Sequence, residues 1–196
     1  FFPKSWSWIP SFLAYYVAIV SVIEIARKKL GVPFQWKLNF KKDGLFFGFR
    51  PFPRAGLLMG SIIFPALIPL GAYLNYGHLV PPIYFLYILV FALINPIFEE
   101  SFWRGLLYHL PFGNAFKIFY SAAGFAFSHY FFWFYWLDLP VMLPVTVIST
   151  FIMGLLWMYF LVRHKNHFYG YWSHVVVDVL NLSIAIFSGV VAQSFL

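Results

Sequence analysis

Six stretches of this chain, each about twenty residues long, are almost wholly apolar, and they limit the possible fold more than any other feature. Hydrocarbon offers the backbone no water, so a stretch that crosses a membrane must satisfy its own hydrogen bonds, and a helix of about twenty residues does this across one bilayer. We therefore expect an all-α, polytopic membrane protein with about six transmembrane helices. The predicted spans run approximately from Trp8 to Ala26, Gly56 to Tyr76, Pro82 to Tyr108, Ala115 to Trp136, Pro140 to Val162 and Tyr169 to Phe195.

The overall composition agrees with a chain that lies in lipid. Hydrophobic residues make up 62% of the sequence and charged residues only 10%, which is too little polar surface to cover a soluble domain. The chain has no cysteine, so disulfides, thiolate catalysis and cysteine-bound zinc are excluded. Because no linker or internal repeat divides the sequence, we expect a single transmembrane domain over residues 1–196.

The net charge of +7 is concentrated between the first two predicted spans. The basic residues of this connection are Arg27, Lys28, Lys29, Lys37, Lys41, Lys42, Arg50 and Arg54. The positive-inside rule places the connection in the cytosol, and alternation of the other spans then places both chain ends on the opposite side. The connection also holds Phe, Trp and Pro, so we expect an interfacial loop that contacts membrane lipids and anchors the chain, with substrate steering or a lid as the alternative. No basic stripe runs along a polar face, so nucleic acid is not expected as a partner.

Apart from Glu24, which sits at the basic end of the first predicted span, three acidic residues fall inside predicted spans, where an ionisable side chain costs about 2.5 to 3.5 kcal/mol and is a functional candidate by default. These are Glu99, Glu100 and Asp178. Glu100 and Arg104 are four residues apart and can pair on one helix face, either as a structural ion pair or as part of a site. Glu99 points about 100° away, toward Asn95 and Trp103, and we expect it to have no local partner. Pro96 is expected to kink this span beside Glu99.

Two further spans contribute polar residues at helical spacing. His129 follows Phe125 by one helical turn, and His174 and Asp178 lie at i and i+4 on one face. Glu99, His174 and Asp178 are expected in the cytosolic half of the membrane and His129 near its middle, so the four side chains can meet. We expect the other histidines to lie in loops or at helix ends, in contact with solvent or headgroups; these are His78, His109, His164 and His167.

These residues form three sequence motifs, EExxxR, FxxxH and Hxxx[N/D], on successive predicted helices. The residues that carry them are Glu99, Glu100, Arg104, Phe125, His129, His174 and Asp178. In this order the motifs resemble those of the CPBP family of CAAX prenyl endopeptidases and bacteriocin-processing membrane proteins. The resemblance covers a core of about residues 82–195, and the first two spans carry no matching motif.

The resemblance implies an intramembrane protease of the glutamic type that uses no cofactor and no metal. Glu99 would activate a water with the help of His129, while Glu100 and Arg104 would orient the base. His174 and residue 178 would stabilise the oxyanion, and since family members often have Asn at this position, Asp178 must be protonated or must hold His174. The substrate would be a membrane-associated or lipidated protein or peptide cut near the cytosolic face. The protein would be a multi-pass integral membrane protein, of a bacterial inner membrane rather than the endoplasmic reticulum.

Three other interpretations remain open at this point. His129, His174 and Glu99 could bind catalytic zinc, although the sequence lacks an HExxH motif. The polar cluster could hold the helices together in a non-proteolytic immunity or binding protein. A small-molecule transporter is the third, and the predicted spans lack the inverted repeat that many transporters have.

Overall fold

The computed structural model describes residues 8–34, 66–67, 70–71, 74, 82–136, 142–165, 167–168 and 170–181. Every element assigned within these ranges is helical, which confirms the all-α fold class. The elements are α1 (Trp8–Lys29), α4 (Pro82–Glu99), the π-helix η4 (Glu100–Leu106), α5 (Asn114–Trp136) and α6 (Met142–His164). Residues 170–181 are also helical and are called the C-terminal helical segment below.

Three helices in the described part of the chain are long and apolar enough to cross a membrane: Pro10–Lys29, Phe85–Leu106 and Pro144–His164. The predicted count of six spans is therefore not confirmed. Most of the predicted span from Gly56 to Tyr76, the end of the span from Tyr169 to Phe195 and most of the basic loop lie outside the described residues. The three helices that are long and apolar enough to cross a membrane indicate an integral membrane protein.

The third predicted span is not the single α-helix that we expect from the sequence. The sequence predicts one helix from Pro82 to Tyr108, whereas α4 ends at Glu99 and the chain continues as the π-helix η4. Pro96 lies inside α4, so one backbone donor is missing a turn before this change. Segments of π-helix are rare and occur mostly at functional sites. Here the change of helix type falls between the two adjacent glutamates.

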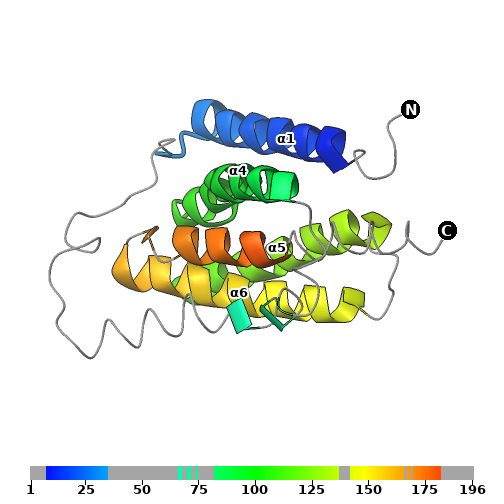
Figure 1. Ribbon diagram of the computed structural model, residues 1–196. Coiled ribbons are helices and arrows are strands. Elements are labelled where there is room, and N and C mark those ends of the chain that lie inside the picture. The colour runs from blue at the N-terminus through cyan, green and yellow to red at the C-terminus, as the bar shows by residue number, and fades with distance from the viewer. Residues whose placement is uncertain are drawn as a thin grey trace, which may run out of the picture.

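The helices lie side by side, and the ends that carry basic residues share one side of the molecule (Figure 1). Arg27, Lys28 and Lys29 end α1, and Arg163 and His164 end α6. The C-terminal helical segment, orange in Figure 1, starts on this same side and runs between α4 and α6. This arrangement places the junction of α4 and η4 close to the basic side of the bundle.

Close approach between helices and an apolar cluster hold the bundle together. A Cβ atom on Gly154 of α6 would lie only 2.8 Å from the Cα of Ala122, so α5 and α6 touch along their backbones there. An apolar cluster fixes α1 and the segment that follows it against η4; its buried members are Ile19, Ile23, Ala26, Val32, Phe34 and Leu106. The helix that carries no sequence motif is thus packed directly against the one that carries most of them.

Candidate active site

The junction of α4 and η4 buries three charged side chains. Glu99, Glu100 and Arg104 are 2%, 1% and 0% exposed. The Nη1 atom of Arg104 lies 3.3 Å from Oε1 of Glu100, which is the pair that the i, i+4 spacing predicts. The guanidinium carbon also lies 4.1 Å from the ring centre of Phe125 and 4.9 Å from that of Trp157. Arg104 is therefore held between a carboxylate and two aromatic faces, which suits its flat, weakly hydrated cation.

His174 joins the two glutamates. Its Nδ1 atom lies 3.0 Å from Oε1 of Glu100, and its Nε2 atom lies 3.1 Å from Oε2 of Glu99. The ring stacks on Trp157 with centroids 4.6 Å apart and an interplanar angle of 23°. An ionised carboxylate can only accept hydrogen bonds, so either both ring nitrogens of His174 carry a proton or one carboxyl does. Each arrangement keeps an exchangeable proton between the side chains.

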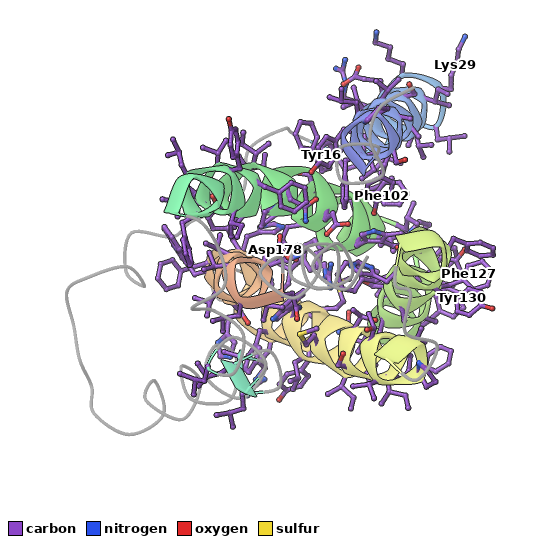
Figure 2. The ribbon with its side chains drawn as sticks, turned by 45° about the vertical axis from the view of Figure 1, so that its right-hand side comes forward. Tyr16, Lys29, Phe102, Phe127, Tyr130 and Asp178 are labelled. Carbon is purple, nitrogen blue, oxygen red and sulfur yellow. The ribbon has the colours of Figure 1, made fainter. Side chains whose placement is uncertain are left out.

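Asp178 lies on the same helix face as His174, as the sequence spacing predicts. Its Oδ1 atom is 3.6 Å from Nε2 of His174, and its Oδ2 atom accepts a hydrogen bond of 2.9 Å from Nδ2 of Asn95. Figure 2 shows Asp178 on the side of the C-terminal helical segment that faces α4. The carboxyl thus contacts both the bridging histidine and a side chain of α4.

Asn95 is a member of the cluster that the motifs do not include. Its Nδ2 atom donates to Oε2 of Glu99 at 3.1 Å as well as to Asp178, and its Oδ1 atom accepts a 2.8 Å hydrogen bond from the hydroxyl of Tyr16. The sequence places Asn95 on the same helix face as Glu99, and the structure confirms this. The hydrogen bond from Asn95 also gives Glu99 a partner within its own helix, in addition to the charged partner that it finds in His174.

His129 approaches this cluster from α5. Its Nδ1 atom lies 2.9 Å from the carbonyl oxygen of Phe125. A carbonyl oxygen only accepts, so Nδ1 must carry the proton and Nε2 of a neutral ring keeps its lone pair. The ring is close enough to Glu99 and His174 for their charges to interact. The side chains expected to converge from three helices do lie around one buried region, with His129 at its edge rather than in the hydrogen-bonded centre.

His167 differs from its expected place in solvent or headgroups. It follows the end of α6 and is half-buried, and burial lowers its pKa below the ordinary value of 6.5, while the carboxylate of Glu100 opposes this shift. Its charge therefore interacts with the cluster. Among the other three histidines that we expected in loops or at helix ends, His109 is exposed in the turn that follows η4, and His164 is the last residue of α6. His78 lies outside the described residues.

The zinc alternative requires His129, His174 and Glu99 to surround one point. Within the part of the chain that the structure describes, no group of three His, Asp or Glu side chains has an arrangement that could hold a metal ion. The described geometry therefore does not fit this ligand set. The contacts of His174 are instead hydrogen bonds to carboxylates.

Apolar helices long enough to span a bilayer, together with a buried network of carboxylates and histidines, define an integral membrane protein with a buried cluster of ionisable side chains. The family model "Type II CAAX prenyl endopeptidase Rce1-like" matches residues 81–180, about half of the chain, and the protein belongs to this family. This confirms the relationship that the three motifs indicate and makes the protein a CAAX-type intramembrane protease, a hydrolase. No curated protein and no solved structure matches the chain.

Proposed function

We propose that the protein hydrolyses a peptide bond of a lipidated or membrane-associated protein with a water activated by Glu99. The observation that carries this proposal is the placement of the Glu99 carboxylate, buried in a membrane helix yet in contact with His174 and Asn95 and within charge range of His129. A carboxylate that served only to pair helices would not need a second histidine nearby. A base that must take up a proton and pass it on needs such a second histidine.

The two close contacts of Glu99 with Asn95 and His174 both fall on Oε2. We assign the other oxygen, Oε1, to the water. In the proposed reaction Glu99 takes one proton from the water. The water oxygen bonds to the carbonyl carbon of the peptide bond, and the carbonyl oxygen becomes an oxyanion. Collapse of this intermediate breaks the C–N bond, and the proton passes from Glu99, with Nε2 of His129 as relay, to the leaving amine. The products are a carboxylic acid, which keeps the second proton of the water, and an amine, and no group other than water is consumed.

The remaining residues have supporting roles in this scheme. His174 as an imidazolium would donate from Nε2 to the oxyanion, in exchange for its 3.1 Å contact with Glu99, once Glu99 has taken up the proton of the water and lost its charge. Asp178 would hold His174 rather than face the oxyanion, which fits its 3.6 Å approach to Nε2. Glu100 and Arg104 would fix the other side of the imidazole ring through Nδ1. If Asp178 positions His174 in this way, an acidic residue can take the place of the Asn that family members often have at this position.

The substrate that we propose is a protein or peptide with a prenylated CAAX terminus, as the family description indicates, cut near the cytosolic face of the membrane. The basic ends of α1 and α6 share one side of the bundle, and by the positive-inside rule this side faces the cytosol. The cluster lies in the half of α4 and η4 toward this side. Membrane lipids surround the protein, and we place it in a bacterial inner membrane rather than the endoplasmic reticulum.

The test uses purified protein in lipid nanodiscs and two quenched fluorescent peptides that end in a CAAX box, one farnesylated on its cysteine and one not. We expect cleavage of the farnesylated peptide on the carboxyl side of the cysteine, located by mass spectrometry, and loss of this cleavage in His129→Ala. The Phe112→Leu variant, at an exposed position of the loop before α5, serves as a matched control. Failure of the wild-type protein to cleave either peptide would contradict the proposed substrate class, and full activity of His129→Ala would contradict the relay.

The same assay separates the zinc alternative. The proposed reaction needs no metal, so dialysis against a chelator should leave the rate of cleavage unchanged. Loss of activity on chelation and its recovery with zinc would instead favour metal-activated water. If alanine variants of the cluster lost their folded state together with activity, the non-proteolytic account, in which these residues only hold the helices together, would gain support.

A further inference from the structure

α1 lies outside the part of the chain that the family model matches, yet one of its side chains reaches the buried cluster. Tyr16 donates a hydrogen bond of 2.8 Å to Oδ1 of Asn95. The neighbouring hydroxyl of Tyr15 accepts a hydrogen bond of 3.0 Å from Nε1 of Trp103 in η4. Figure 2 shows Tyr16 at the contact between α1 and α4. Tyr16 therefore bonds to the side chain, Asn95, that donates to Oε2 of Glu99.

The amide of Asn95 can work in only one orientation. Its nitrogen has two protons, and these go to two carboxyl groups, those of Glu99 and Asp178. A flipped amide would turn its oxygen toward both carboxyl groups, and an acceptor facing two acceptors in a buried site is strongly unfavourable. The hydroxyl of Tyr16 is the group that bonds to the amide oxygen. Tyr16 thus selects the orientation in which Asn95 holds both carboxyl groups.

The ring of Tyr16 has a separate attachment. It stacks on Phe98 with centroids 4.5 Å apart and an interplanar angle of 17°. Phe98 belongs to α4, so this stacking fixes the ring whether or not the hydroxyl is present. The hydroxyl can be removed without removing the packing, which makes its role open to a clean test.

We propose that Tyr16, acting through Asn95, is a positioning residue of the active site, so that α1 is part of the catalytic apparatus rather than only a membrane anchor. This proposal rests on the proposed role of Glu99 as the base. The Glu99 carboxylate, which has three rotatable bonds, is held in one place by Asn95 of α4 and His174 of the C-terminal helical segment, and Tyr16 of α1 orients Asn95. Misplacement of a reacting group by about 1 Å can reduce a rate by about 100-fold.

The first experiment is a double-mutant cycle with Tyr16→Phe and Asn95→Leu, using the farnesylated peptide and nanodisc protein. We expect Tyr16→Phe to lower kcat by roughly 10- to 100-fold with little change in KM and in melting temperature. If Tyr16 acts through Asn95, the Tyr16→Phe change should have almost no further effect in the Asn95→Leu background. Equal effects of Tyr16→Phe in both backgrounds, or an unchanged kcat, would overturn the proposal.

Two controls match this design. Tyr120→Phe removes a phenol hydroxyl from α5, where the side chain is 54% exposed, and should leave kcat unchanged. Ser21→Ala removes a hydroxyl from α1 itself, where Ser21 bonds only to its own helix at the carbonyl of Val17, and should also have no effect on kcat. A loss of kcat in Ser21→Ala equal to that in Tyr16→Phe would assign the effect to α1 in general and contradict the specific contact.

The outcome can be separated from the fate of the proposed function. If Glu99→Gln is inactive while Tyr16→Phe and Asn95→Leu have the wild-type kcat, the role of α1 is wrong and the role of Glu99 stands. If the wild-type protein cleaves no peptide, the contact of Tyr16 with Asn95 can still be tested by infrared difference spectra, in which the carboxyl C=O band of each variant is compared with that of the wild type. Tyr16→Phe should then shift this band and Tyr120→Phe should not, and identical spectra for all three proteins would overturn the proposal.

Discussion

Nδ1 of His174 lies 3.0 Å from Glu100, and Nε2 of the same ring lies 3.1 Å from Glu99, so two glutamates adjacent in sequence contact opposite sides of one imidazole. The change from α-helix to π-helix falls between these glutamates. Their carboxyl groups therefore share a partner although the residues point in different directions along the helix. His174 is the side chain on which both halves of the cluster depend.

Replacing His174 with glutamine is the first prediction. The variant lacks the cation between the carboxyl groups, so we expect kcat to fall by on the order of 10²- to 10³-fold, the range found for loss of an oxyanion donor. Loss of one partner from a buried charged network also costs about 3–5 kcal/mol of stability. The measurements are peptide cleavage and thermal unfolding in detergent. A variant with unchanged kcat would show that His174 has no part in the chemistry.

The second prediction concerns Gly170, at the start of the C-terminal helical segment. A Cβ atom at this position would lie 2.9 Å from Oε2 of Glu100. The Gly170→Ala variant must therefore displace this carboxylate and with it His174, and we expect a fall in kcat of up to about 100-fold. Gly113→Ala is the matched control, because no atom lies within 4 Å of its added Cβ. Equal activity of the two variants would mean that Glu100 can move without consequence.

The third prediction concerns Arg104 and the shape of its cation. Lysine would keep the positive charge beside Glu100 but would lose the flat guanidinium that lies over Phe125 and Trp157. We expect Arg104→Lys to lower the melting temperature and reduce kcat. Arg163→Lys, at an exposed position near the end of α6, is the control and should change neither. If Arg104→Lys behaved like the control, the site would need charge alone.

The sequence predicts which ionisable residues lie close together better than it predicts the contacts that surround them. Buried ionisable residues in apolar runs are conspicuous, and i, i+4 spacing gives the Glu100 and Arg104 pair and the shared face of His174 and Asp178. Tyr16 contacts Asn95 across 79 positions, and nothing in the pattern of an apolar helix distinguishes a tyrosine that bonds to a site from one that faces lipid. Such a contact depends on tertiary packing, which helical periodicity does not contain.

Two other features could not be predicted from the sequence, for different reasons. A π-helix uses the same residues as an α-helix, so the change at Glu100 leaves no mark on the apolar pattern. The nearness of Gly170 to Glu100 arises because the chain turns back after α6, and a glycine near a predicted helix start is ordinarily taken as part of a turn. The third span and the surroundings of Glu99 therefore differ from expectation.

The fourth prediction is a dependence of stability on pH. Burial lowers the pKa of His167 below 6.5, so the unfolded chain takes up a proton at this residue at a higher pH than the folded protein does. Stability is therefore greatest above this value and decreases as the pH falls through it toward the pKa of the folded state. We expect His167→Gln to flatten the decrease in melting temperature from about pH 7.5 to about pH 5.5. His109→Gln, at an exposed site, should flatten it less, and equal curves for His167→Gln and the wild type would contradict this account.

The rate of peptide cleavage by Glu99→Gln tests the central claim most directly. Glutamine keeps the size of the side chain and can still contact His174, but it cannot accept a proton from water. With the melting temperature and nanodisc reconstitution of the variant equal to those of the wild type, we predict a single-turnover rate reduced by on the order of 10²- to 10⁴-fold. A rate within a few-fold of the wild type would contradict Glu99 as the base and, with it, the mechanism proposed for this protein.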